Sequence, residues 1–116
     1  MSAQKSEILY IECKDGPGAA EARIGRVAYS KSGQTLQYRD KHFRSLNGAG
    51  FKSNYYDVES GDEYWISGCK RSGGDALYSA IVEIDEDVRE EYWARIRKKP
   101  ESVGLARFKS IGKYRK

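Results

Sequence analysis

The stretch richest in chemically active side chains is Asp62–Tyr78, DEYWISGCKRSGGDALY. It places a serine, a cysteine and two cations before a glycine pair, and these are the residue types of a nucleophile or a phosphate-binding loop. A P-loop needs its glycines before a Lys-Ser/Thr pair that opens a helix, but here the cations come first and Asp75–Tyr78 begins a β-rich run. Ser67 also lacks the Gly-x-Ser-x-Gly context of a nucleophile elbow. The stretch therefore predicts a hairpin in which a glycine-rich loop joins two strands.

Thiol and metal chemistry have little support in the residue types. The chain has two cysteines, Cys13 and Cys69, without a Cys-x-x-Cys spacing, and its single histidine, His42, lies in a different segment. A closed zinc site needs four such donors. The acidic run Glu83–Glu91 does not fit an EF-hand, because the sixth position counted from Asp85 is not glycine. We therefore expect free thiols, no catalytic residues, no metal and no cofactor.

The many aromatic and basic residues are more informative about function than the cysteines, the histidine or the acidic run. The chain contains nine tyrosines, two tryptophans and three phenylalanines, and small barrels bind single-stranded nucleic acid on aromatic platforms flanked by cations. The candidate nucleic-acid-binding residues are Tyr56, Trp65, Arg39, Lys41, Arg44, Lys52, Lys70, Arg71, Lys109, Lys113 and Arg115. The alternative is that the aromatics form the core and the cations keep the surface soluble, since no RNP signature is present.

The positive charge is unevenly distributed along the 116 residues. Residues 1–97 contain 14 of the 21 cations and 16 of the 17 carboxylates, a net charge of −2, whereas residues 98–116 contain seven cations and one carboxylate, a net charge of +6. A chain of this length makes one domain. We therefore expect residues 1–97 to fold as that domain, and residues 98–116 to form a basic tail that need not be ordered.

The pattern of the domain is mainly β. Short β-rich runs are separated by turn residues about every eight to twelve positions, which predicts a small curved antiparallel sheet or barrel of five to six strands. The expected strands lie at Glu7–Lys14, in a hairpin over Arg23–Asp40 that turns at Gly33, and at His42–Leu46, Phe51–Val58, Tyr64–Gly68 and Leu77–Ile84. A tight turn over Glu59–Asp62, which contains Gly61, precedes the strand at Tyr64–Gly68. Along Glu7–Lys14, alternate residues are expected on opposite faces.

One helix of about three turns should follow these strands and pack on the sheet. Asp85 is the predicted N-cap, with carboxylates in the first turn. Val88, Tyr92 and Ile96 recur every four residues and form one apolar stripe. Pro100 then ends the helix. The complete expectation is an α+β fold with a small barrel and a single C-terminal helix.

Four segments, YIECKDG, ARIGRVAYSKSGQTLQYRDKHF, YWISG and EIDEDVREEYWARIRK, resemble a family of short uncharacterised bacterial proteins that are often labelled 1-deoxy-D-xylulose-5-phosphate synthase. The resemblance covers roughly residues 7–98. That label does not suit the chain, because a thiamine-diphosphate synthase is far longer and needs a Gly-Asp-Gly motif, which this sequence does not contain. The resemblance implies a family without an assigned activity or catalytic residues.

These observations predict a non-enzymatic binding module. The leading ligand is RNA or single-stranded DNA, and the alternative is a protein partner that contacts exposed aromatics. No apolar run approaches the about 20 residues that span a bilayer, and no signal peptide is visible. We expect a cytoplasmic monomer that does not bind membranes.

Overall fold

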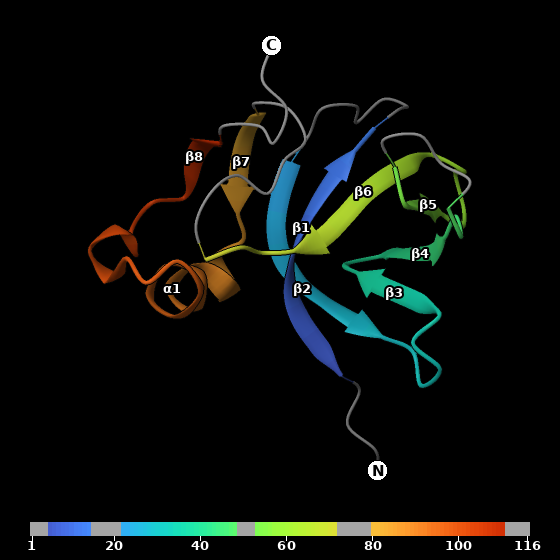
Figure 1. The fold of residues 1–116 in the computed structure, drawn as a ribbon, viewed down its shortest axis with the longest axis horizontal. Coiled ribbons are helices and arrows are strands. Elements are labelled where there is room, and N and C mark those ends of the chain that lie inside the picture. Colours follow the sequence, from blue (N-terminus) through green and yellow to red (C-terminus); the bar gives the residue numbers. More distant parts are fainter. Residues whose placement is uncertain (1–4, 15–21, 49–52, 72–79, 111–116) are drawn as a thin grey trace.

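The computed structural model describes residues 5–14, 22–48, 53–71 and 80–110. Figure 1 shows its eight strands, which form one sheet in the order β1-β6-β5-β4-β3-β2-β7-β8 with β1 also paired to β2. The strands are β1 (Ser6–Cys13), β2 (Ala22–Tyr29), β3 (Thr35–Tyr38), β4 (Lys41–Ser45), β5 (Tyr55–Asp57), β6 (Glu63–Gly68), β7 (Ala80–Ile84) and β8 (Arg107–Ser110).

The first six strands close into an antiparallel barrel, because β1 pairs with both β2 and β6. The predicted small barrel is confirmed. Two of its hairpins turn at the expected glycines, Gly33 between β2 and β3 and Gly61 between β5 and β6, with φ of +77° and +80°. Both angles lie in the left-handed region that glycine adopts without steric cost.

Strand β7 leaves the barrel. It runs parallel to β2 and antiparallel to β8, and it does not pair with β6. The predicted hairpin between Tyr64–Gly68 and Leu77–Ile84 is therefore wrong. The physical reason is closure of the barrel. Because β1 and β5 already pair with the two edges of β6, no edge of β6 is left for β7. The glycine pair of the expected loop lies outside the described residues.

Residues after Arg97 also differ from the expected tail. They form a 3-10 turn, η3 (Pro100–Ser102), and then strand β8. Phe108 packs against the rings of Tyr92 and Trp93 at centroid distances of 6.1 and 5.3 Å. The folded domain therefore continues to residue 110, and residues 111–116 lie outside the described part.

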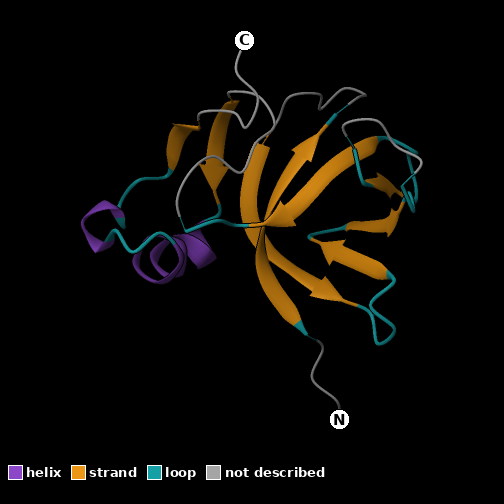
Figure 2. Cartoon of the chain, viewed as in Figure 1, coloured by secondary structure: helices purple, strands orange, loops and turns teal. Residues whose placement is uncertain are grey.

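A continuous helical segment joins β7 to these residues. It begins as 3-10 helix η1 (Glu86–Val88), continues as α1 (Arg89–Glu91) and ends as π-helix η2 (Tyr92–Ile96). The single C-terminal helix is confirmed, and it lies beside β7, on the opposite side of the molecule from β3, β4 and β5 (Figure 2). No helix in the described part of the chain could cross a membrane.

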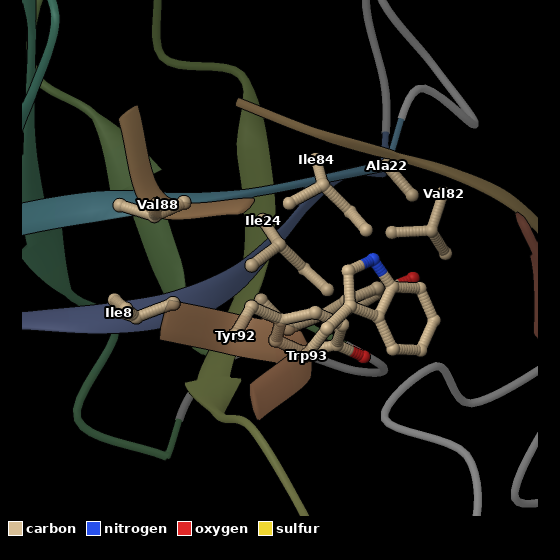
Figure 3. Packing of buried hydrophobic residues seen from close by; sticks show 9 residues of the cluster. Ile8, Ala22, Ile24, Val82, Ile84, Val88, Tyr92 and Trp93 are labelled. Atoms are coloured by element: carbon tan, nitrogen blue, oxygen red, sulfur yellow. The ribbon is translucent and has the colours of Figure 1, made fainter. Parts of the chain in front are cut away.

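Two apolar cores result, one on each face of β1. Leu9, Ile11 and Cys13 belong to the core inside the barrel, whereas Ile8 and Tyr10 belong to the core beneath the helical segment. This is the alternation predicted for Glu7–Lys14. In the second core, residues of the helical segment meet side chains of β1, β2 and β7 (Figure 3).

The predicted helical stripe is confirmed, with a graded burial. Val88 and Tyr92 are fully buried, and Ile96 is partly buried against the same core.

We expect Ile96→Ala to lower the free energy of unfolding by about 1–2 kcal/mol, below the range for a fully buried isoleucine, because part of the side chain already meets water. Urea denaturation measures the change. Arg95→Ala, an exposed position in the same turn, is the matched control and should change stability by less than about 0.5 kcal/mol. An equal effect of both variants would contradict docking through this stripe.

Candidate functional site

A gap lies between β3 and β7, which pair with different parts of the same edge of β2. Strand β3 pairs with Ala28 and Tyr29, whereas β7 pairs with Ala22–Ile24. The two strands diverge around Gly25, and Asp85, the residue after β7, lies in the gap with its amide donating to the carbonyl of Ile24 at 2.9 Å. This placement brings a carboxylate between β7 and the barrel.

The carboxylate of Asp85 gathers side chains from three segments. Its Oδ1 accepts hydrogen bonds from Nε and Nη2 of Arg23 at 3.1 and 2.8 Å and from Nη2 of Arg39 at 2.8 Å. Its Oδ2 accepts a hydrogen bond from the hydroxyl of Tyr38. Burial and then this hydrogen bond raise the pKa of Tyr38 to about 12. We call Asp85, Arg23, Arg39 and Tyr38 the Asp85 cluster.

The predicted N-cap position of Asp85 is confirmed, but its side chain has another role. Asp85 does precede η1, and its carbonyl accepts from the amide of Val88 at 3.2 Å, but its side chain makes no capping hydrogen bond. Two guanidinium groups and a phenol attract the carboxylate more strongly than the neutral amides of one short turn, because hydrogen bonds to charged partners are the stronger ones.

Two backbone features make the cluster possible. Gly25 leaves room for it, since a Cβ there would lie 2.5 Å from both Oδ2 of Asp85 and Cε1 of Tyr38. Arg39 belongs to the two-residue turn between β3 and β4 and has φ of +56°. A non-glycine residue in this region is uncommon and such outliers concentrate at functional sites. The turn thus places a guanidinium beside Asp85 at a conformational cost.

A cavity of about 200 Å³ adjoins the cluster. It lies at the end of the barrel where β1 and β3 end and β2, β4 and β6 begin, and we call it the barrel mouth. Its lining consists of Ile11, Cys13, Phe43, Tyr38 and Tyr64 with the charged residues Arg23, Arg39, Asp40 and Lys41. Burial raises the pKa of Tyr64 above its ordinary value, so this phenol is a neutral group of the wall.

One rim cation is held by an ion pair at its outer side. Lys41 Nζ lies 3.4 Å from Oδ2 of Asp57. Burial alone would raise the pKa of Asp57, but the amides of Glu59 and Ser60 and the ammonium of Lys41 together lower it. The Asp57 carboxylate is therefore charged and largely engaged with the β5–β6 turn.

A second charged row crosses β2, β7 and β8. Glu83 pairs in register with Arg23 on one side and Arg107 on the other, with a nitrogen–oxygen distance of 3.9 Å in each direction. Together with Asp85 this row alternates cations and carboxylates, which links the outer strands to the barrel mouth. These distances indicate weak individual pairs.

The outer surface of β4 and β5 holds two of the predicted residues, Arg44 and Tyr56. Along β4, Lys41, His42 and Arg44 are exposed, while Phe43 is fully buried in the barrel. Arg44 lies opposite Tyr56 of β5 in the antiparallel register. Because side chains alternate along a strand, His42 and Arg44 lie on the outer side of β4, whereas Lys41 lies on the side of Phe43, at the rim of the barrel mouth. We call His42, Arg44 and the partly exposed Tyr56 the β4–β5 face.

The remaining sequence candidates are spread over the molecule. Trp65 packs against the core beneath the helical segment, and its indole nitrogen is buried without a hydrogen-bond partner among the described residues. Lys70 and Arg71 follow β6, and Lys109 is exposed on β8, which β3, β2 and β7 separate from β4. Lys52, Lys113 and Arg115 lie outside the described residues.

Sequence patterns alone did not indicate Arg23, Tyr38 or Asp85 as site residues. Their hydrogen bonds join positions 15, 47 and 62 residues apart. Searches with this chain match no protein-family model, no curated protein and no solved structure. The geometry of the described residues is therefore the basis for any functional assignment.

Proposed function

We propose that the protein is a non-enzymatic module that binds single-stranded nucleic acid, either RNA or single-stranded DNA. The observation that carries the proposal is the β4–β5 face, where the exposed Arg44 lies opposite the partly exposed Tyr56 on the neighbouring strand. A cation that meets phosphate beside a ring that stacks on a base is the minimal arrangement for sequence-tolerant binding.

The spacing of cations along β4 supports an extended ligand. Lys41 and Arg44 are three residues apart, about 10 Å at the rise of a strand, so Arg44 lies on the outer face and Lys41 at the rim of the barrel mouth. The strand itself contains no carboxylate. Arg39 precedes β4 and extends the basic row toward the barrel mouth. A backbone that follows β4 could therefore contact several cations in sequence.

Binding is tested by titrating labelled single-stranded RNA, single-stranded DNA and duplex at two salt concentrations. We expect both single strands to bind more tightly than duplex, with affinity that falls as salt rises. Tyr56→Ala should weaken binding by about 1–3 kcal/mol, the contribution of one stacked base. Arg44→Gln should weaken all sequences alike and reduce the salt slope by about 0.7.

Lys31→Gln is the matched control, because it removes one exposed cation from the β2–β3 turn, at the opposite end of the barrel from the mouth. It should leave both the affinity for single strands and the salt slope unchanged. If the intact protein binds no nucleic acid at low salt, where electrostatic attraction is strongest, the proposal is wrong.

A protein partner is the second candidate function, and a different surface favours it. Strand β8 ends the described sheet, and its neighbour β7 exposes 53% of Ile81. An extended peptide could add to such an edge and cover the apolar side chain. For either ligand, we propose that the protein acts as a cytoplasmic monomer.

A further inference from the structure

We propose that the barrel mouth binds a small organic anion, a molecule whose single aromatic ring enters the cavity while its carboxylate or phosphate meets Arg39 and Lys41. This site adjoins the β4–β5 face and shares the rim cations Arg39 and Lys41 with the basic row along β4, but it would serve a different class of ligand from a nucleic-acid strand.

The size of the cavity sets the size of the ligand. Its volume of about 200 Å³ corresponds to about seven water molecules at about 30 Å³ each. Pockets for drug-sized molecules are larger, about 300–1,000 Å³. A single ring with one substituent therefore matches the space.

The inner wall suits an aromatic ring. Phe43 and Tyr64 meet edge to face with their centroids 4.7 Å apart, and Ile11 and Cys13 complete the apolar lining. Rings of this kind favour edge-to-face or offset contacts with a third aromatic group. An apolar wall with a few convergent polar groups is the usual composition of a small-molecule site.

The charged rim favours an anion. Three cations and one carboxylate, Asp40, line the mouth, and Lys41 pairs with Asp57 at 3.4 Å while its side chain stays 47% exposed. Arg23 is engaged through two of its nitrogens with Asp85. Arg39 donates to Asp85 through Nη2, and its side chain is 54% exposed. Because a guanidinium has five N–H donors, Arg39 keeps donors that can point into the mouth.

A purely structural role explains less of the geometry. Arg23 and Tyr38 already satisfy the Asp85 carboxylate with three hydrogen bonds. The half-exposed Arg39 adds a second positive charge, and it does so from a left-handed backbone conformation that glycine would adopt without steric cost. An arginine held there by Asp85 is a fixed donor for a ligand anion, since guanidinium geometry matches carboxylate and phosphate.

The test uses four probes: benzoate, phenyl phosphate, benzyl alcohol and inorganic phosphate. Amide chemical shifts of the ¹⁵N-labelled full chain are followed during titration. We expect benzoate or phenyl phosphate to shift the amides of Cys13, Phe43 and Tyr64. Benzyl alcohol lacks the charge and inorganic phosphate lacks the ring, so each should bind at least about tenfold more weakly than the better aromatic anion. The tighter of the two aromatic anions identifies the natural anionic group as carboxylate or phosphate.

Arg39→Gly removes the rim donor and suits the backbone angle, so it should keep the fold and weaken the better aromatic anion at least about tenfold. Asn47→Gly is the matched control, because Asn47 has φ of +53° but lies away from the mouth. If neither aromatic anion shifts mouth amides at about 10 mM, ten times a weak millimolar Kd, the proposal is wrong. Unchanged affinity in Arg39→Gly would also overturn it. Tyr56→Ala should leave probe binding intact, which separates this result from the nucleic-acid test.

Discussion

Deletion of residues 98–116 should lower the free energy of unfolding by about 3–6 kcal/mol, because it removes parts of the core beneath the helical segment. Phe108, which packs on Tyr92 and Trp93, would be lost. The indole nitrogen of Trp93 would also lose its acceptor, the carbonyl of Leu105 at 3.0 Å. A domain with a typical stability of about 5–15 kcal/mol would then be close to unfolding.

Urea denaturation and the dispersion of backbone amide signals measure this effect. Deletion of residues 111–116 alone is the control, since it keeps β8 and the contacts of Phe108. We expect that shorter deletion to retain the midpoint and the dispersed spectrum. If the chain ending at Arg97 instead keeps full dispersion and an unchanged midpoint, β8 contributes nothing to stability. Residues 98–116 would then be the dispensable basic tail that the charge distribution predicts.

Replacement of Asp85 by alanine should destabilise the protein by about 3 kcal/mol, near the lower limit for breaking a buried ion pair. The carboxylate is 9% exposed, whereas the Arg23 and Arg39 side chains are 31% and 54% exposed, so water will partly solvate the guanidinium groups left behind. Asp85→Asn keeps an acceptor and should cost less. Asp87→Ala, an exposed carboxylate two residues later, is the control and should change stability by less than about 0.5 kcal/mol.

The pH dependence adds a readout specific to the Asp85 cluster. The folded pKa of Tyr38, about 12, exceeds the ordinary value of 10.0. This difference stabilises the fold fully below about pH 10 and is lost as the pH rises toward 12, because the unfolded phenol ionises first. In Asp85→Asn the Tyr38 pKa should fall, since part of its elevation comes from the hydrogen bond to the carboxylate. Unchanged alkaline unfolding and an unchanged midpoint would show that the cluster contributes little.

Local patterns predicted much of the fold. Alternation along Glu7–Lys14 separates the two faces of β1, and glycines at 33 and 61 mark two real turns. The four-residue recurrence of Val88 and Tyr92 finds the buried side of the helical segment. Each of these signals lies within one strand, turn or helix, where side-chain direction follows directly from the backbone period.

The tertiary structure alone decided which strands meet and what the chemistry-bearing residues contact. The run Arg107–Ser110 is too short and too basic for its sequence to indicate a strand. It forms β8 because it pairs with the edge of β7 and because Phe108 packs on the ring of Tyr92. Asp85 has the sequence context of a helix cap, yet its carboxylate contacts Arg23 and Tyr38, which come from β2 and β3. Partners this distant along the chain are brought together by closure of the barrel and by the parallel pairing of β7 with β2, and a local pattern contains no information about either.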